Sequence, residues 1–144
     1  SNTISYSSPV QVGALTNWLK VTADYQAISA VKTDGTLWGW GSGYSGSTGH
    51  NSATNYSSPV QVGALTNWLK LSGGYNNRYC IKTDGTLWSW GDNSQGQLGH
   101  GNTVNLSSPV QVGGLTTWLG ELIVLMLLPP VIHFMRGEKT ISVN

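Results

Sequence analysis

The chain repeats itself every 50 residues, and this period constrains its fold more than any other feature. The sequence YSSPVQVGALTNWLK at residues 6–20 recurs unchanged at residues 56–70, and its segment SSPVQVG appears a third time at residues 107–113. The sequence KTDGTLW at residues 32–38 recurs in the same way at residues 82–88. Such a period is typical of solenoids, propellers and related arrays, in which each repeat is one supersecondary unit.

The local pattern of each repeat predicts short strands. Residues 18–22 alternate between apolar and polar side chains, which is the period of a half-buried strand. Residues 28–33 and 37–40 form two further runs, and a fourth run begins at Pro9, where proline removes no ladder donor. No helical apolar period occurs in residues 1–119, so the predicted fold class is all-β.

Asp-Gly pairs connect the second and third runs of each repeat. Asp34-Gly35 and Asp84-Gly85 predict tight type I′ hairpins, because that turn needs a positive φ at both central residues. Short strands with Gly-rich connections, repeated at this length, are typical of propeller blades. We therefore expect a partial β-propeller of about two and a half four-stranded antiparallel blades with a period of 50 residues.

The repeat register divides the chain into units. Two units span residues 7–56 and 57–106, and an incomplete third unit spans residues 107–119. Residues 120–144 form a tail outside the pattern. Because the sequence begins in mid-repeat, we expect further blades on both sides of this stretch. Arrays of this kind need about three units to bury their faces, so we also expect self-association through open blade faces.

The tail allows two interpretations. Leu122 to Leu128 is apolar throughout, but it is far shorter than the roughly 20 residues of a membrane helix, so we expect no membrane span. The first interpretation is therefore a genuine apolar segment. The second is the third repeat translated in the wrong frame. The codons allowed for His133 to Ile141, read from two bases into His133, permit Leu-Tyr-Ala-Trp-Gly-Glu-Asn-Asp, which is close to Leu87 to Asn93.

The second repeat carries a family resemblance. A strand that follows SSPVQVG and a tryptophan leads into KTDGTLWSWGDNSQGQLGHG at residues 82–101. This pattern resembles the repeat of the regulator of chromosome condensation family, and the resemblance covers residues 1–119. It implies a propeller of about seven blades that serves as a rigid protein-interaction surface. The first repeat departs from the pattern where Asp24 replaces Gly74, so we expect its blade to be less regular.

The recurring tryptophans and glycines are interpreted as structural. Trp38 and Trp40 are two residues apart and so share one strand face, which favours packing between neighbouring blades over an aromatic platform for sugar. The recurring glycines are expected in turns that need a positive φ. The candidate structural residues are Trp38, Trp40, Trp88, Trp90, Asp34, Gly35, Asp84, Gly85, Gly41, Gly91, Gly96 and Gly99.

The composition narrows the possible functions. Charged residues make up 9% of the chain against roughly 25% in an ordinary domain. The net charge is +1, which argues against a nucleic-acid binder that works by bulk electrostatics. Cys80 is the only cysteine, so an intramolecular disulfide and a cysteine-based zinc site are excluded. No nucleophile–base motif, acid pair or metal cluster appears in the sequence, so we expect no enzyme, cofactor or metal site.

Two binding functions remain. The first is a non-enzymatic protein–protein interaction scaffold that forms part of a larger propeller, with its binding residues unassigned. Low charge and near-identical repeats favour a bacterial-type protein at the cell surface or outside the cell, although no signal peptide is visible at the start. The alternative is a carbohydrate-binding, lectin-like propeller module. The candidate sugar-contacting residues are Tyr6, Tyr44, Tyr56, Tyr75, Asn76 and Asn77.

Overall fold

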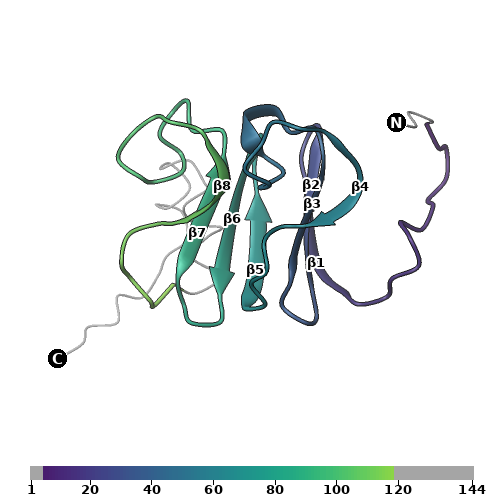
Figure 1. Cartoon of the computed structure of the whole chain (residues 1–144), viewed down its shortest axis with the longest axis horizontal. Coiled ribbons are helices and arrows are strands. Elements are labelled where there is room, and N and C mark those ends of the chain that lie inside the picture. The colour runs from purple at the N-terminus through teal and green to yellow at the C-terminus, as the bar shows by residue number, and fades with distance from the viewer. Residues whose placement is uncertain (1–4, 119–144) are drawn as a thin grey trace, which may run out of the picture.

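Two four-stranded antiparallel sheets lie side by side in the computed structural model, which describes residues 5–118 (Figure 1). Each sheet is a meander whose strands follow one another in chain order, as in a propeller blade. The predicted all-β partial propeller is therefore confirmed. The first blade contains β1 (Trp18–Ala23), β2 (Ala27–Lys32), β3 (Leu37–Gly41) and β4 (Tyr56–Gln61), with a short 3-10 helix η1 (Tyr44–Gly46) before β4. The second contains β5 (Trp68–Gly73), β6 (Asn77–Lys82), β7 (Leu87–Gly91) and β8 (Leu106–Gln111).

The blades are offset from the sequence repeats. The SSPVQ run that opens each repeat unit forms β4 and β8, each of which closes the sheet of the preceding unit. The prediction that Pro9 begins a strand is wrong, because residues 9–12 form no strand. Its repeat equivalent Pro59 lies inside β4, beside a register shift between Gly39 and Gly41 on the partner strand. An edge strand tolerates proline there because one side of its ladder is unpaired.

The hairpin turns also differ from the prediction. Gly35 has a φ of 79°, but Asp34 is not among the residues with positive φ, so the turn is not type I′. Instead, the Gly35 N–H donates to the Lys32 carbonyl, which gives a type I turn followed by a left-handed glycine. The Asp34 carboxylate accepts the Thr36 N–H and hydroxyl at 3.0 and 2.6 Å, which favours this turn. The second hairpin repeats these bonds at Lys82, Asp84, Gly85 and Thr86.

The main apolar core lies between the two blades. Trp90 is fully buried there, and its indole N–H donates to the Ser47 carbonyl of the first blade at 3.2 Å. Burial of one such ring contributes roughly 4–6 kcal/mol as an upper bound. The core cluster contains Val31, Leu37 and Val62 from the first blade and its connection, with Trp68, Leu71, Cys80 and Trp90 from the second.

Docking of the blades accounts for this burial, as equivalent positions show. Leu71 on β5 faces the first blade and is 3% exposed. Its repeat equivalent Val21 on β1 is 59% exposed. Among residues 5–118, no sheet covers the face of the first blade to which Val21 belongs.

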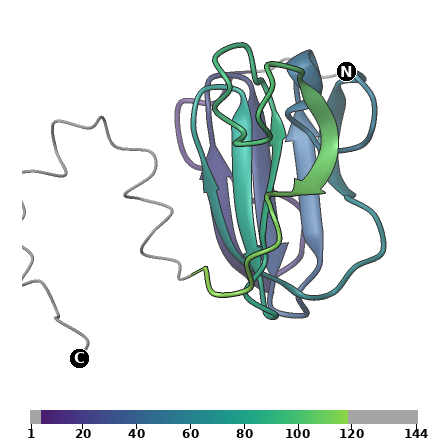
Figure 2. The same ribbon diagram turned by 90° about the vertical axis from the view of Figure 1, so that its left-hand side faces the viewer.

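The strands of both sheets run along one common direction, so that their connections gather at two ends (Figure 2). We call one end the loop end, formed by residues 24–26, 42–55, 74–76 and 92–105. The opposite hairpin end is formed by residues 33–36, 62–67 and 83–86. No helix within the described residues is long and apolar enough to cross a membrane. The apolar run and the wrong-frame hypothesis of the tail lie outside the described residues.

Candidate interaction surface at the loop end

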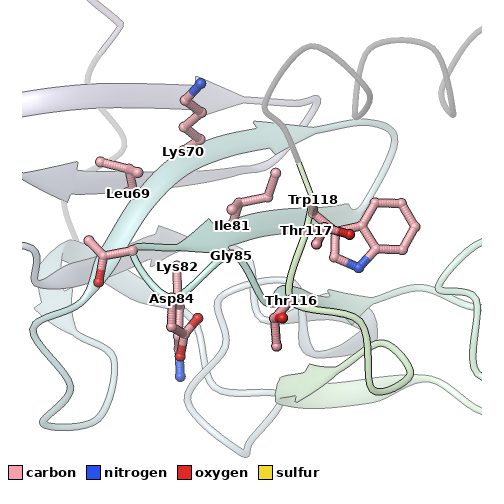
Figure 3. A pocket seen from close by; sticks show the side chains of 10 residues that line it. Leu69, Lys70, Ile81, Lys82, Asp84, Gly85, Thr116, Thr117 and Trp118 are labelled. Carbon is pink, nitrogen blue, oxygen red and sulfur yellow. The ribbon is translucent and has the colours of Figure 1, made fainter. Parts of the chain in front are cut away.

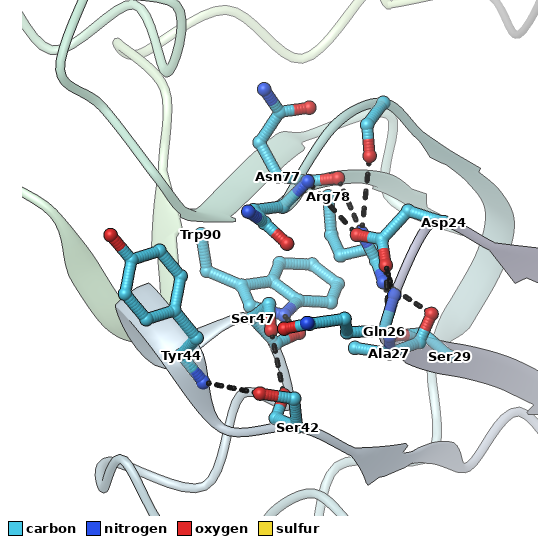
Figure 4. A network of polar contacts seen from close by, with 12 residues as sticks. Asp24, Gln26, Ala27, Ser29, Ser42, Tyr44, Ser47, Asn77, Arg78 and Trp90 are labelled. Atoms are coloured by element: carbon cyan, nitrogen blue, oxygen red, sulfur yellow. Dashed lines mark hydrogen bonds and ion pairs between the residues drawn. The ribbon is translucent and has the colours of Figure 1, made fainter.

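An ion pair joins the two blades beneath the loop end (Figure 4). Nη1 of Arg78 on β6 lies 2.7 Å from Oδ2 of Asp24, and their side chains are 0% and 5% exposed. The Arg78 Nε donates to the Ser29 hydroxyl at 3.2 Å, and Nη2 donates to the Ala27 carbonyl at 2.9 Å. The buried guanidinium is therefore both charge-paired and hydrogen-bonded, as a buried charge requires.

The Asp24 carboxylate fixes loops of both blades. Its Oδ1 accepts the N–H groups of Gln26 and Ala27 at 2.9 and 2.8 Å, and its Oδ2 accepts the Asn76 N–H of the second blade at 2.9 Å. Burial raises the pKa of Asp24, but the hydrogen bonds from Arg78, Ala27 and Gln26 and the Arg78 charge lower it by more. The pKa of Asp24 therefore lies below its ordinary value, and the side chain is a carboxylate at neutral pH.

The connection between β3 and β4, which contains η1, is hydrogen-bonded to the loop that contains Asp24. The Ser42 N–H donates to the Gln26 carbonyl at 2.9 Å, and the Ser47 hydroxyl donates to the Ser42 carbonyl at 3.0 Å. The Ser47 carbonyl in turn accepts the indole N–H of Trp90, as Figure 4 shows. Three loops from two blades are thus tied together by side-chain and backbone hydrogen bonds.

Each of these three loops presents an exposed tyrosine. Tyr25 is 77% exposed, Tyr75 is 72% exposed and Tyr44 is 64% exposed. Tyr25 was not among the residues predicted from the sequence, although its spacing of 50 residues from Tyr75 was a visible signal. Tyrosine offers a large contact area with few rotatable bonds, and therefore suits a binding surface.

Only some of the residues predicted to contact sugar have exposed side chains. Tyr56 is half-buried, and its ring packs on that of His50 with centroids 4.4 Å apart. Asn76 and Asn77 are buried rather than exposed, because the backbone N–H of Asn76 is bound to Asp24 and Asn77 lies inside β6. These three side chains are therefore less accessible to a sugar than the sequence suggested, and sugar contact by the set stays a prediction. The exposed members of the set are Tyr6, Tyr44 and Tyr75.

The recurring tryptophans occupy two kinds of position. Trp88 and Trp90 both contact the core cluster between the blades. Trp38 and Trp40 instead pack on Trp18, with ring centroids 5.8 and 5.9 Å apart, on the face of the first blade that no described sheet covers.

The remaining structural candidates lie at the ends of strands and in the connection between β7 and β8. Gly41 and Gly91 end the third strand of each blade with φ values of 99° and 101°. A side chain on either glycine would meet the backbone of the neighbouring loop. Gly96 and Gly99 have φ values of 75° and 79° in the connection between β7 and β8.

The side chains that resemble catalytic groups, the pair of His100 and Ser89 and the thiol of Cys80, have structural roles. His100 Nε2 lies 3.0 Å from the Ser89 hydroxyl, which is the spacing of a nucleophile and its base. Ser89 is fully buried, however, and its hydroxyl donates to the Leu98 carbonyl at 2.8 Å. Burial also raises the pKa of Cys80 to about 12, so its thiol is inert. Residues 5–118 contain no group of three His, Cys, Asp or Glu side chains that could hold a metal.

A cavity of about 370 Å³ opens near the hairpin end (Figure 3). Its charged lining groups are Lys70, Lys82 and Asp84, and Figure 3 shows Lys70 pointing away from Asp84. The Lys82 ammonium lies over the ring of Trp88, 3.5 Å from its centroid. The polar groups therefore do not converge on a common point, as a ligand site would require.

The fold and the repeated tryptophan-bearing blades define a propeller repeat protein. Residues 34–81 and 84–119 match the family model of the Regulator of chromosome condensation (RCC1) repeat, and a second model of this repeat matches residues 68–97. The chain belongs to the RCC1 repeat family.

Solved structures share this fold. Human WBSCR16 has a TM-score of 0.60 and 20% identity over 67% of this chain. Prp20p from Saccharomyces cerevisiae has a TM-score of 0.63 and 16% identity over 72%. Yeast RCC1 (Prp20) bound to Kap60 has a TM-score of 0.65 and 21% identity over 75%. The chain spans 25%, 28% and 26% of the respective structures. The sequence matches no curated protein.

Proposed function

We propose that this chain is part of a non-enzymatic propeller scaffold that binds a protein partner through its loop end. RCC1-family propellers of similar fold bind proteins: Prp20p was studied for its binding to Gsp1p and histones, and yeast RCC1 was solved bound to Kap60. These relatives support the class of partner, a protein, without assigning its identity.

The proposal rests on three exposed tyrosines, whose loops are held in place by the hydrogen bonds described above. Tyr25 follows Asp24 in the chain, Tyr75 precedes Asn76, whose N–H donates to Asp24, and Tyr44 lies in η1. Because the loops are already ordered, binding loses less conformational entropy than it would with mobile loops. Tyrosines are also enriched among the residues that dominate protein–protein binding energy.

The charge distribution supports a protein partner over a nucleic acid. Among the described basic residues, Arg78 is paired, and Lys32 and Lys82 are buried against tryptophan rings. The exposed basic side chains of residues 5–118 are Lys20 and Lys70, on β1 and β5 rather than at the loop end. The loop end therefore lacks the dense positive charge that binds phosphates.

The test compares a loop-end variant with a hairpin-end control. The immobilised chain is incubated with an extract of its source organism, and captured proteins are identified. The double variant Tyr25→Ala/Tyr75→Ala removes two exposed rings, and Leu65→Ala truncates an exposed apolar side chain at the opposite end. We expect a protein captured by the wild type and by Leu65→Ala to be lost with the double variant. Equal capture by all three chains would contradict the proposal.

A second arm addresses the carbohydrate alternative. Mono- and oligosaccharides are titrated into the same three chains while tryptophan fluorescence is recorded. Saccharide binding that the double variant abolishes, together with no captured protein, would overturn the proposal in favour of the lectin-like function. The expected result is no saccharide response.

A further inference from the structure

A second cavity, of about 330 Å³, opens where the two blades meet. It is lined by residues 49–51 of the first blade, by the connection at residues 62–65 and by residues of the second blade. Its volume is within the roughly 300–1,000 Å³ of small-molecule pockets. The cavity lies at the mutual contact of the two described blades, and not on a face that the described residues leave uncovered.

Apolar side chains form much of the cavity wall. Val62 and Trp68 are buried and belong to the core cluster between the blades. Trp88 is half-buried and packs against this cluster, with its ring edge-on to that of Trp68 and the two centroids 5.6 Å apart. Leu65 is 49% exposed, so the cavity runs from solvent to the core. Such walls suit the apolar body of a ligand, and an aromatic ring in particular.

Polar side chains gather on one part of the wall. His50 and Asn51 are neighbours in the chain and both line the cavity. The Asn51 N–H donates to the Ser107 carbonyl at 2.7 Å, and the Ser107 hydroxyl donates to Asn51 Oδ1 at 3.2 Å. Ser107 immediately precedes Ser108, the next polar residue of the lining. These bonds bring His50, Asn51 and Ser108 together, which is the convergence that a ligand site requires.

These polar groups have hydrogen-bonding capacity that the fold does not use. His50 Nε2 lies 3.1 Å from the Gly39 carbonyl, which only accepts, so Nε2 is the donor and Nδ1 of the neutral ring is an acceptor. Asn51 uses its Oδ1 for Ser107, and its Nδ2 donor makes no hydrogen bond within residues 5–118. The Ser108 hydroxyl makes none within the same residues. A carboxamide or hydroxyl group, which both donates and accepts, matches this set.

The charge of the lining restricts the ligand further. No Asp, Glu, Lys or Arg side chain lines the cavity. The Lys82 ammonium lies over the ring of Trp88, but Lys82 is not part of the lining. A charged ligand would lose its hydration without gaining an opposite charge, which is unfavourable. The lining therefore selects a neutral molecule.

Asn51 is a departure from the repeat. Its equivalent in the second repeat is Gly101, and both residues have positive φ, at 55° and 71°. Glycine adopts this region freely, whereas residues with a side chain do so rarely. The first repeat thus has an amide at a position where the backbone favours glycine, and this amide lines the cavity.

We propose that the cavity between the blades binds a small neutral molecule that has an aromatic ring and one carboxamide or hydroxyl group. The ring lies against Trp68 and Trp88, and the polar group bonds to His50, Asn51 and Ser108. The site is separate from the exposed tyrosines, so this inference does not rest on protein binding at the loop end.

The test titrates three probes into the isotope-labelled full chain. Phenylacetamide carries a ring and an amide, phenylacetate is its anion of equal size, and acetamide lacks the ring. The indole N–H signals in proton–nitrogen correlation spectra report where a probe binds. We expect phenylacetamide to shift the signals of Trp68 and Trp88 to saturation and to leave those of Trp18 and Trp38, their repeat equivalents outside the cavity, unchanged. We expect phenylacetate to bind at least tenfold more weakly, and acetamide not to saturate.

Variants locate the binding groups. Asn51→Gly installs the residue of the equivalent position, so the backbone is retained while the amide is removed. We expect it to weaken phenylacetamide binding about fivefold, which is the loss of one hydrogen bond. Gly101→Asn makes the reverse change outside the cavity and is expected to leave binding unchanged. Ser108→Phe occupies the cavity and is expected to abolish the saturable shifts. Circular dichroism establishes that each variant is folded, and Ser108→Leu replaces a variant that is not.

The same titrations can overturn the proposal. Signals of Trp68 and Trp88 that do not shift to saturation with phenylacetamide would do so. Equal binding of phenylacetate would also contradict it, because the lining then does not select a neutral ligand. Undiminished binding by folded Asn51→Gly or by the folded cavity-filling variant would place the probe elsewhere.

The alternative occupant is an apolar side chain of a partner protein. The capture experiment at the loop end distinguishes this case when Ser108→Phe is added to it. A protein that is lost with Ser108→Phe but retained by Tyr25→Ala/Tyr75→Ala would assign the cavity to that partner, and would overturn the proposal of a small molecule.

Discussion

Arg78 of the second blade reaches the first blade and places its Nη1 atom 2.7 Å from Oδ2 of Asp24. This is the one ion pair within residues 5–118, and both side chains are almost wholly buried. Two buried charges that are lost together cost far less than one charge left alone. The pair therefore specifies which blade faces meet, and at the same time orders the loops that carry the exposed tyrosines.

The ion pair makes stability depend on pH. Because folding lowers the pKa of Asp24 below its ordinary value of 3.8, the unfolded chain binds this proton more readily. The stabilisation is complete above the unfolded pKa and declines as the pH falls through the folded pKa. We expect the free energy of unfolding of the wild type to fall toward that of Asp24→Asn between about pH 5 and pH 2. Urea denaturation across this range checks the prediction, and a difference that does not change with pH would contradict it.

The two blades provide a matched comparison for the tryptophans. Trp90→Ala removes a fully buried ring and its bond to the Ser47 carbonyl, so we expect a loss of about 3–5 kcal/mol. Trp40→Ala changes the equivalent but half-buried residue of the first blade, and we expect less than half of that loss. Chemical denaturation of both variants measures the difference. Equal losses would mean that docking of the second blade on the first does not determine the stability.

Cys80 offers a probe of blade separation. Its thiol faces the first blade, is fully buried and has a pKa raised to about 12. We expect a chromogenic disulfide reagent at neutral pH to label the native chain only as fast as the blades open, and to label it at once in denaturant. Arg78→Ala, which leaves Asp24 buried without its partner, is expected to accelerate the labelling. Rapid labelling of the native wild type would contradict the described core.

A comparison of alanine substitutions at Gly85 and Gly113 distinguishes the stability cost of backbone strain from the cost of a steric overlap. Both have positive φ, at 78° and 60°, but a side chain on Gly85 would overlap the Thr116 carbonyl, whereas nothing lies within 4 Å of one on Gly113. We expect Gly113→Ala to cost about 1 kcal/mol from φ strain alone and Gly85→Ala to cost more than about 2 kcal/mol. Thermal and urea unfolding compare the two. Similar costs would show that residues 116–118 do not rest on the hairpin.

Much of the fold follows from the repeated segments. KTDGTLW predicts a hairpin in each blade because its apolar runs and Asp-Gly pair act locally, within a few residues. The turn type was wrong because the Asp34 carboxylate binds the N–H and hydroxyl of Thr36, and this bond competes with the backbone preference of the pair. The offset between the sequence repeats and the blades could not be predicted, because nothing local shows that the SSPVQ run pairs with the strand before it.

The contacts between blades could not be predicted in the same way. Asp24 was visible as a departure from the repeat, but its partner Arg78 is 54 residues away, and a single sequence does not pair them. Asn76 and Asn77 looked accessible because asparagine is usually a surface residue. They are buried because the loop that carries them binds the first blade.

The most direct test is a double-mutant cycle that replaces Asp24 and Arg78 with the residue types at the equivalent positions of the other repeat, Gly74 and Ile28. The variants are Asp24→Gly, Arg78→Ile and both together, and the free energy of unfolding is measured by urea denaturation at neutral pH. We expect each single variant to lose about 3 kcal/mol or more, and the double variant to lose clearly less than the sum, with a coupling energy of about 2 kcal/mol. Losses that add to within about 0.5 kcal/mol would show that Asp24 and Arg78 do not hold the blades together.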